Sequence, residues 1–120
     1  MHELGVAQGI LDLVRHHVPE HQAGAVRAVT VRLGRLSGVV ADSLDFCFGA
    51  IVAGTPYSGA SLSIDHVATR ARCNDCTREF DVDGLVFRCP GCAGPHIRLI
   101  SGDELQVVAV EIEDTTPEVT

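Results

Sequence analysis

The chain has 120 residues, of which 46% are hydrophobic and 21% charged, a composition typical of one folded, water-soluble domain of ordinary size. The formal net charge is −7 and all nine basic residues are arginines, so the chain lacks the basic stripe with which proteins bind nucleic acids or anionic membranes. No apolar run approaches the roughly 18 residues that span a bilayer, and the start Met1-His2-Glu3-Leu4 is unlike a secretory signal, so we expect a cytoplasmic protein.

The first part of the chain predicts a helix followed by a strand. Apolar residues recur at three- and four-residue steps from about Val6 to Val18, the spacing of one helix face, and Pro19 closes the segment. Between Val26 and Leu33, apolar residues alternate with others along the chain, and this period of two predicts a half-buried strand.

The next segments predict a second helix and two further strands. The second helix presents Leu44, Phe48, Ile51 and Val52 and is expected to end at Gly54. Asp42 or Ser43 is the expected N-terminal cap, because short polar side chains satisfy the first N–H groups of a helix. A strand is expected over residues 61–71, and a last strand, rich in valine and isoleucine, over residues 105–113.

This order of elements predicts an α+β fold, with two helices on a three-stranded sheet and an inserted four-cysteine zinc-knuckle domain. The core domain is expected to comprise residues 1–71 and 101–113, and the inserted zinc-binding domain residues 72–100. Residues 114–120 are expected to form a flexible acidic tail.

Four cysteines have the spacing of a metal site. Cys73 and Cys76 form one C-x2-C pair, and Cys89 and Cys92 form a second pair after twelve intervening residues. Two residues between cysteines allow a single tight turn to direct both sulfurs at one ion, and two such turns complete a tetrahedron around Zn²⁺. Because the protein fills all four positions, the site is predicted to be structural and not catalytic. Iron in an electron-transfer protein uses the same ligand set and remains an alternative.

The N-terminus offers a second candidate metal site. The α-amino group of Met1, the amide nitrogen of His2 and its imidazole can close two chelate rings around one ion, and Glu3 could add its amide nitrogen or its carboxylate. Such nitrogen-rich sites suit Ni²⁺ or Cu²⁺ in square-planar or tetragonal geometry. A histidine at this position, taken alone, is more commonly an exposed side chain without a ligand.

Three separated motifs, with the paired cysteines, carry a resemblance to a known family. They are the start Met1-His2-Glu3-Leu4, the segment Gly34-Arg35-Leu36-Ser37-Gly38 before a helix, and the later segment Ser101-Gly102-Asp103-Glu104-Leu105. In this order, and over nearly the whole chain, they resemble the HypA/HybF family of hydrogenase nickel-incorporation proteins.

The resemblance implies a nickel metallochaperone for [NiFe]-hydrogenase maturation, which in some organisms also serves urease. It implies nickel, as transferred cargo, at Met1, His2 and Glu3, and zinc at the four cysteines. It further implies two partners, a GTPase accessory protein of nickel insertion and the hydrogenase large subunit. Some family members have an acidic residue at the nickel site, in the loop before the second helix. In this chain the corresponding position holds valine, and Asp42 is displaced from it. His96 lies four residues beyond the last cysteine, and its role is left open.

Other classes of function were weighed against this interpretation. A zinc-ribbon module for protein interaction, without nickel, is the main alternative and predicts indifference to changes at the N-terminus. An enzyme is not expected, because the neighbouring carboxylates Asp103 and Glu104 would point to opposite faces of a strand. The oligomeric state is left open, including a homodimer that exchanges its C-terminal strand.

Overall fold

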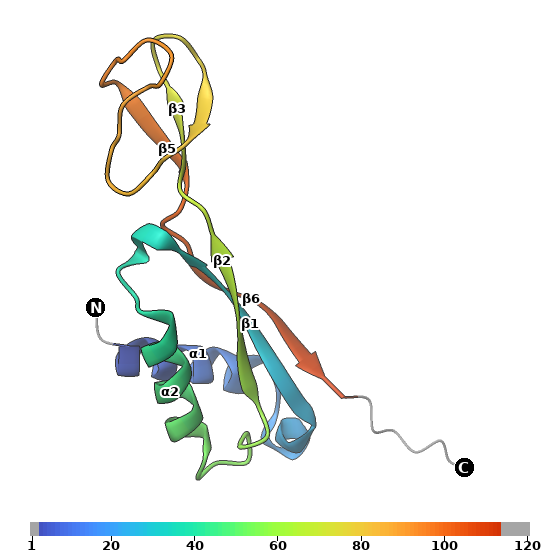
Figure 1. Ribbon diagram of the computed structural model, residues 1–120. Coiled ribbons are helices and arrows are strands. Elements are labelled where there is room, and N and C mark those ends of the chain that lie inside the picture. Colours follow the sequence, from blue (N-terminus) through green and yellow to red (C-terminus); the bar gives the residue numbers. More distant parts are fainter. Residues whose placement is uncertain (1–2, 114–120) are drawn as a thin grey trace.

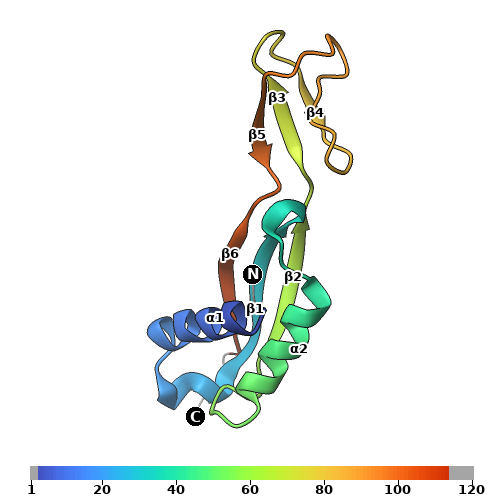
Figure 2. The ribbon, with the colours of Figure 1, turned by 90° about the vertical axis from the view of Figure 1, so that its left-hand side faces the viewer.

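Two helices cover one face of a three-stranded sheet. The computed structural model describes residues 3–113. Helix α1 (Glu3–His17) and helix α2 (Ala41–Val52) lie on the same side of strands β1 (Val26–Gly34), β2 (Ser61–Val67) and β6 (Leu105–Ile112), as Figures 1 and 2 show. The strand order is β2-β1-β6, with β1 parallel to β2 and antiparallel to β6. Helix α2 supplies the crossover that a parallel pair requires.

The alternation of β1 places its apolar residues in the core between the sheet and the helices. Val29, Val31 and Leu33 are buried, whereas Arg32, which lies between Val31 and Leu33, is exposed. The core continues into both helices through apolar residues spaced by one helical turn: Leu11 and Val14 from α1, and Leu44 and Phe48 from α2. The expected α+β core is therefore confirmed, and among the described residues no helix is both long and apolar enough to cross a membrane.

The ends of the helices differ in part from the expectations. Helix α1 ends at His17, close to the expected boundary, and the Tyr57 hydroxyl donates a hydrogen bond of 2.7 Å to the Val18 carbonyl just beyond it. The expected cap of α2 is wrong. Val40 is the N-cap residue and its side chain makes no capping bond, while Asp42 lies in the first turn, where a carboxylate complements the helix dipole.

A second three-stranded sheet lies beyond the first and contains the cysteine segment (Figure 1). It consists of β3 (Arg70–Cys73), β4 (Glu79–Asp81) and β5 (Ile97–Ser101), in the order β4-β3-β5. The single strand expected over residues 61–71 is therefore wrong, because it is two strands in different sheets. The break falls at Ala68 and Thr69, whose carbonyls accept hydrogen bonds from the Ser101 hydroxyl and the Val82 N–H.

The two sheets meet where the second and third motifs of the sequence touch. The Gly34 N–H donates to the Glu104 carbonyl at 2.8 Å, and the Leu36 N–H, in the short 3₁₀ helix η2 (Arg35–Ser37), donates to the Gly102 carbonyl at 2.6 Å. A Cβ atom on Gly34 would lie 2.1 Å from the Gly102 oxygen, so only glycine allows this approach. Gly102 itself has φ +121°, a conformation that L side chains rarely adopt. We call this contact between residues 34–36 and 102–104 the junction.

Candidate metal centres

The structure brings the four predicted cysteines together at the end of β3, with Cys73 in that strand and the other three in turns beside it. Their sulfur atoms lie within 4.8 Å of one another, with Cys73 Sγ 3.6 Å from Cys92 Sγ and Cys76 Sγ 3.5 Å from Cys89 Sγ. Sulfurs bound about 2.3 Å from a tetrahedral zinc ion stand about 3.8 Å apart, whereas a disulfide requires about 2.05 Å. The cluster is therefore consistent with a zinc site of four thiolate ligands.

The two C-x2-C turns share a main-chain hydrogen bond and a residue in the left-handed conformation. In the first, the Thr77 N–H donates to the Cys73 carbonyl at 2.9 Å, and in the second the Ala93 N–H donates to the Cys89 carbonyl at 2.8 Å. Thr77 and Ala93, each directly after the second cysteine of its pair, have φ values of +65° and +60°. This left-handed residue turns the chain back on itself, so that both sulfurs of each pair face the centre of the cluster.

We expect the substitution Ala93→Gly to raise the free energy of unfolding of the second sheet by about 0.5–1 kcal/mol. The left-handed conformation costs a non-glycine residue roughly 1–2 kcal/mol, and the greater freedom of glycine in the unfolded chain removes part of the gain. Urea unfolding of zinc-loaded protein measures the shift. The matched control is Ala50→Gly on the exposed face of α2, which should destabilise by about 1 kcal/mol. Shifts of the same sign in both variants would contradict the explanation.

The thiols of the cluster differ in how readily they ionise. The backbone N–H groups of Cys92 and Gly91 donate to Cys89 Sγ at 3.5 and 3.3 Å, and they lower the pKa of Cys89 to about 6 despite its burial. Although the Gly94 N–H favours the Cys92 thiolate, the hydrogen bond between Cys92 and Cys73, desolvation, and the neighbouring thiols of Cys89 and Cys76 raise the pKa of Cys92 to about 12. A metal ion that binds all four sulfurs must displace the protons of these thiols, because the thiolate is the ligand.

Other polar groups near the cluster are paired with one another. His96 Nδ1 lies 3.0 Å from Asp75 Oδ2, and both side chains are largely exposed. Among residues 3–113, the four cysteines are the one group of three or more histidines, cysteines and acidic residues arranged to hold a metal ion, so His96 stands outside the cluster. Cys47 is partly buried and packs against the core of the first sheet, so it does not belong to the metal cluster.

Of the three predicted nickel ligands, the structure describes Glu3. Met1 and His2 are outside the described residues. Glu3 is the first residue of the helix, and its Oε2 accepts a hydrogen bond of 2.9 Å from the backbone N–H of Val40, at the start of α2. Sequence reasoning missed this contact, because no local pattern connects two residues 37 positions apart.

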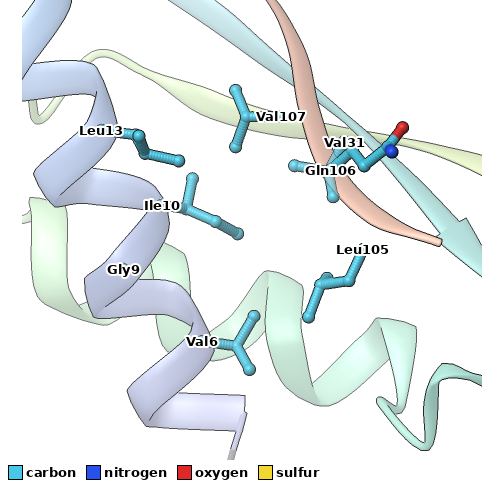
Figure 3. Close-up of a pocket in the computed structure, with 8 residues that line it drawn as sticks. All are labelled: Val6, Gly9, Ile10, Leu13, Val31, Leu105, Gln106 and Val107. Atoms are coloured by element: carbon cyan, nitrogen blue, oxygen red, sulfur yellow. The ribbon is translucent and has the colours of Figure 1, made fainter.

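An apolar groove, also unforeseen, lies between α1 and β6 (Figure 3). Its volume is about 260 Å³, with side chains from α1, from the central strand and from β6: Val6, Ile10, Leu13, Val31, Leu105, Gln106 and Val107. Leu13 is exposed at this groove, unlike the residues on the buried face of α1. None of the lining residues is titratable or a metal donor, so the groove offers apolar contact and no site for metal chemistry.

The chain is similar to known proteins over nearly its full length. A model of the protein family described as "Hydrogenase/urease nickel incorporation, metallochaperone, hypA" matches residues 1–112. The hydrogenase maturation factor HypA of Streptomyces avermitilis is 47% identical over an alignment of 119 positions, which covers 95% of this chain and 88% of that protein. The protein of the same name from Geobacter metallireducens is 40% identical over 94% of this chain and 100% of its own length.

Solved structures share the fold. The solution structure of the Ni metallochaperone HypA from Helicobacter pylori has a TM-score of 0.65 and 23% sequence identity, and the match covers 94% of this chain and 98% of that one. A second solution structure of a HypA protein has a TM-score of 0.68 at 23% identity, over 93% and 96% of the two chains. Taken with the two relatives and the family match, these findings place the chain in the HypA family of hydrogenase/urease nickel-incorporation metallochaperones, which are metal carriers and not enzymes.

Proposed function

We propose that the chain binds one Ni²⁺ ion through Met1, His2 and Glu3 and delivers it for the maturation of [NiFe]-hydrogenase or urease. The observation that carries the proposal is the family match over residues 1–112, which begins at the very residues that offer the chelate. The proposed partners are a GTPase accessory protein of nickel insertion and the hydrogenase large subunit, and the proposed location is the cytoplasm. The first sheet and its helices would form the nickel-binding domain, and the second sheet the zinc-binding domain.

The chemistry of the N-terminus supports nickel as a cargo that can be released. The α-amine, an amide nitrogen and an imidazole form a nitrogen-rich set that Ni²⁺ prefers in tetragonal geometry. A site at a chain end is reached by a partner without unfolding the core. Because the amine must lose its proton to bind the metal, the affinity should fall as the pH decreases through the pKa of the amine.

We further propose that Cys73, Cys76, Cys89 and Cys92 bind a structural zinc ion. All four positions of a tetrahedral ion would be filled by protein sulfur, which leaves no open position for a substrate or a water molecule. The buried apolar side chains around the cluster are few, namely Ala71, Phe80 and Val82. A core of this size does not hold three short strands together unaided, so the ion would supply the missing stability.

Nickel titration of untagged protein tests the proposed carrier function. We expect His2→Ala to weaken nickel binding by at least a hundredfold, because it removes the imidazole and opens one chelate ring, while zinc content stays at one ion per chain. The matched control is His21→Ala, which changes an exposed histidine in the short helix η1 (Glu20–Ala25) and should leave nickel affinity unchanged. If His2→Ala and wild type bind nickel equally, the carrier function fails and the zinc-ribbon interaction module is favoured.

A further inference from the structure

The Glu3 carboxylate binds the backbone N–H of Val40, the N-cap residue of α2, which is the donor that the third-residue Glu of a capping box would bind. Val40 is the N-cap residue of this helix, with φ −87° and ψ 119°, and no side chain of its own segment caps it. Its N–H donates to Glu3 Oε2 at 2.9 Å, and its carbonyl accepts the N–H of Leu44 in the first turn at 2.9 Å. A carboxylate at this place satisfies a backbone donor and complements the positive end of the helix dipole.

The loop that leads into α2 is held by side chains at two successive residues. The Val39 N–H donates to Ser37 Oγ at 3.2 Å, and the Val40 N–H donates to Glu3. The first bond is local, within the loop, whereas the second joins the loop to the start of α1. Gly38, which lies between Ser37 and Val39, has φ +78° and allows the chain to turn there. The Glu3 side chain thereby adds a polar link between the start of α1 and the N-terminus of α2, which also pack against each other.

This arrangement bears on which atom of Glu3 serves the metal. A carboxylate that accepts the Val40 N–H and lies against a helix N-terminus is already engaged in favourable interactions, and binding of Ni²⁺ by that group would compete with them. The first main-chain N–H groups of any helix, in contrast, stand outside its hydrogen-bond ladder, so the amide nitrogen of Glu3 can serve a metal without breaking the helix.

We propose that the Glu3 carboxylate is a positioning group and not a nickel ligand: it fastens the start of α1 to the N-terminus of α2 and so holds the adjacent residues in place for the metal. The inference rests on the proposed nickel function. Holding the residue next to His2 in one place reduces the conformational entropy that the metal site loses on binding. Because Val40 and its contact are exposed, the effect on affinity is a modest one, about two- to fivefold.

The test measures nickel affinity and the nickel absorption spectrum of full-length, untagged variants. Glu3→Ala should weaken affinity about two- to fivefold without changing the spectrum, because no ligand is lost. Glu3→Gln keeps an acceptor oxygen and should restore most of the affinity. Val40→Pro removes the donor and touches no ligand, so it should weaken affinity by the same factor as Glu3→Ala, and the double variant should be no weaker than either single one.

A second measurement reports the contact in the absence of nickel. In metal-free Glu3→Ala, hydrogen exchange in the first turn of α2 should be faster than in wild type, while exchange in β1 is unchanged; circular dichroism verifies that Val40→Pro is folded. A shifted spectrum and a loss of affinity above fiftyfold in Glu3→Gln would make the carboxylate a ligand and overturn the inference. Unchanged exchange and affinity in Glu3→Ala would also overturn it, as would additive losses in the double variant.

The two experiments fail separately. If wild type and His2→Ala bind nickel equally, the carrier function is wrong, yet the exchange experiment on metal-free protein still shows whether Glu3 fastens α1 to α2. If His2→Ala abolishes binding and Glu3→Ala changes neither affinity nor exchange, the carrier function stands and the positioning role falls.

Discussion

Replacement of Cys89 by serine is expected to unfold the second sheet while the first sheet keeps its structure. Cys89 is 2% exposed, and its sulfur accepts two backbone N–H groups, so it belongs to the small core as well as to the metal cluster. Binding of a structural zinc ion contributes about 10–16 kcal/mol in zinc-finger peptides. Neighbouring apolar side chains cannot replace a loss of that size, because Phe80 and Val82 are the larger buried ones around the cluster.

Metal analysis and residue-level hydrogen exchange measure this outcome. Zinc should fall below one ion per chain at micromolar concentrations, and the amides of β3 and β5 should lose protection while those of β1 keep it. Cys47→Ser is the matched control: Cys47 packs partly buried against the first core, so its loss should leave the zinc content unchanged. One zinc per chain in Cys89→Ser, bound with wild-type affinity, would contradict the four-ligand site.

The separate fate of the two sheets follows from how they are connected. Two adjacent chain segments link them, residues 68–69 and residues 102–104, and the hydrophobic clusters of the two sheets share no buried residue. Unfolding of the second sheet therefore exposes none of the core that holds α1 and α2 on the first. Cooperative units of this kind open independently when few contacts cross between them.

The cysteine cluster could be predicted from the sequence because its geometry is local. Two residues between cysteines determine each turn, and the left-handed residues Thr77 and Ala93 repeat the same turn twice. The assignment of β1 also followed from a local signal, the period of two that buries Val29 and Val31. Features that depend on a few neighbouring residues were thus within reach of sequence reasoning.

The break between β2 and β3 was missed, although the sequence carries a faint signal for it. Leu62 and Ile64 lie on the inner face of β2 at even positions, whereas Ala71 and Cys73 of β3 are buried at odd positions. A shift by one residue reverses the face of every side chain in a strand, so a single continuous strand could not bury both pairs. The residues between Ile64 and Ala71 show no clear alternation of apolar and polar side chains, so the change from even to odd positions was not evident.

The capping of α2 could not have been predicted from local residues. Asp42 and Ser43 are the residue types that cap helices, but the helix begins before them, at Ala41. The carboxylate at this terminus comes from Glu3, 37 positions away from Val40, and only the packing of α1 beside α2 brings it there. Long-range contacts of single side chains leave no periodic trace in a sequence.

Substitution of Gly34 by alanine is expected to destabilise the first sheet by about 3 kcal/mol, the upper end of the usual cost of overpacking. A Cβ at this position would lie 2.1 Å from the Gly102 oxygen and 2.7 Å from the Asp103 nitrogen, and both are backbone atoms that no rotamer change can move. Gly34 has φ −80° and ψ 151°, which alanine adopts readily, so the effect is steric and not conformational. To relieve the clash, the junction must lose the hydrogen bonds that Gly34 and Leu36 donate to Glu104 and Gly102.

Urea unfolding followed by the signals of the first sheet measures the loss, and faster amide exchange at Leu36 would locate it at the junction. The matched control is Gly49→Ala in α2, where an added Cβ meets no atom within 4 Å; the same substitution should there stabilise the helix by about 1 kcal/mol. Wild-type stability in Gly34→Ala would mean that the two motifs approach less closely than the structure shows. A loss in Gly34→Ala beside a gain in Gly49→Ala would show that contact with the Gly102 main chain, and not the preference of a glycine for its backbone angles, requires glycine at position 34.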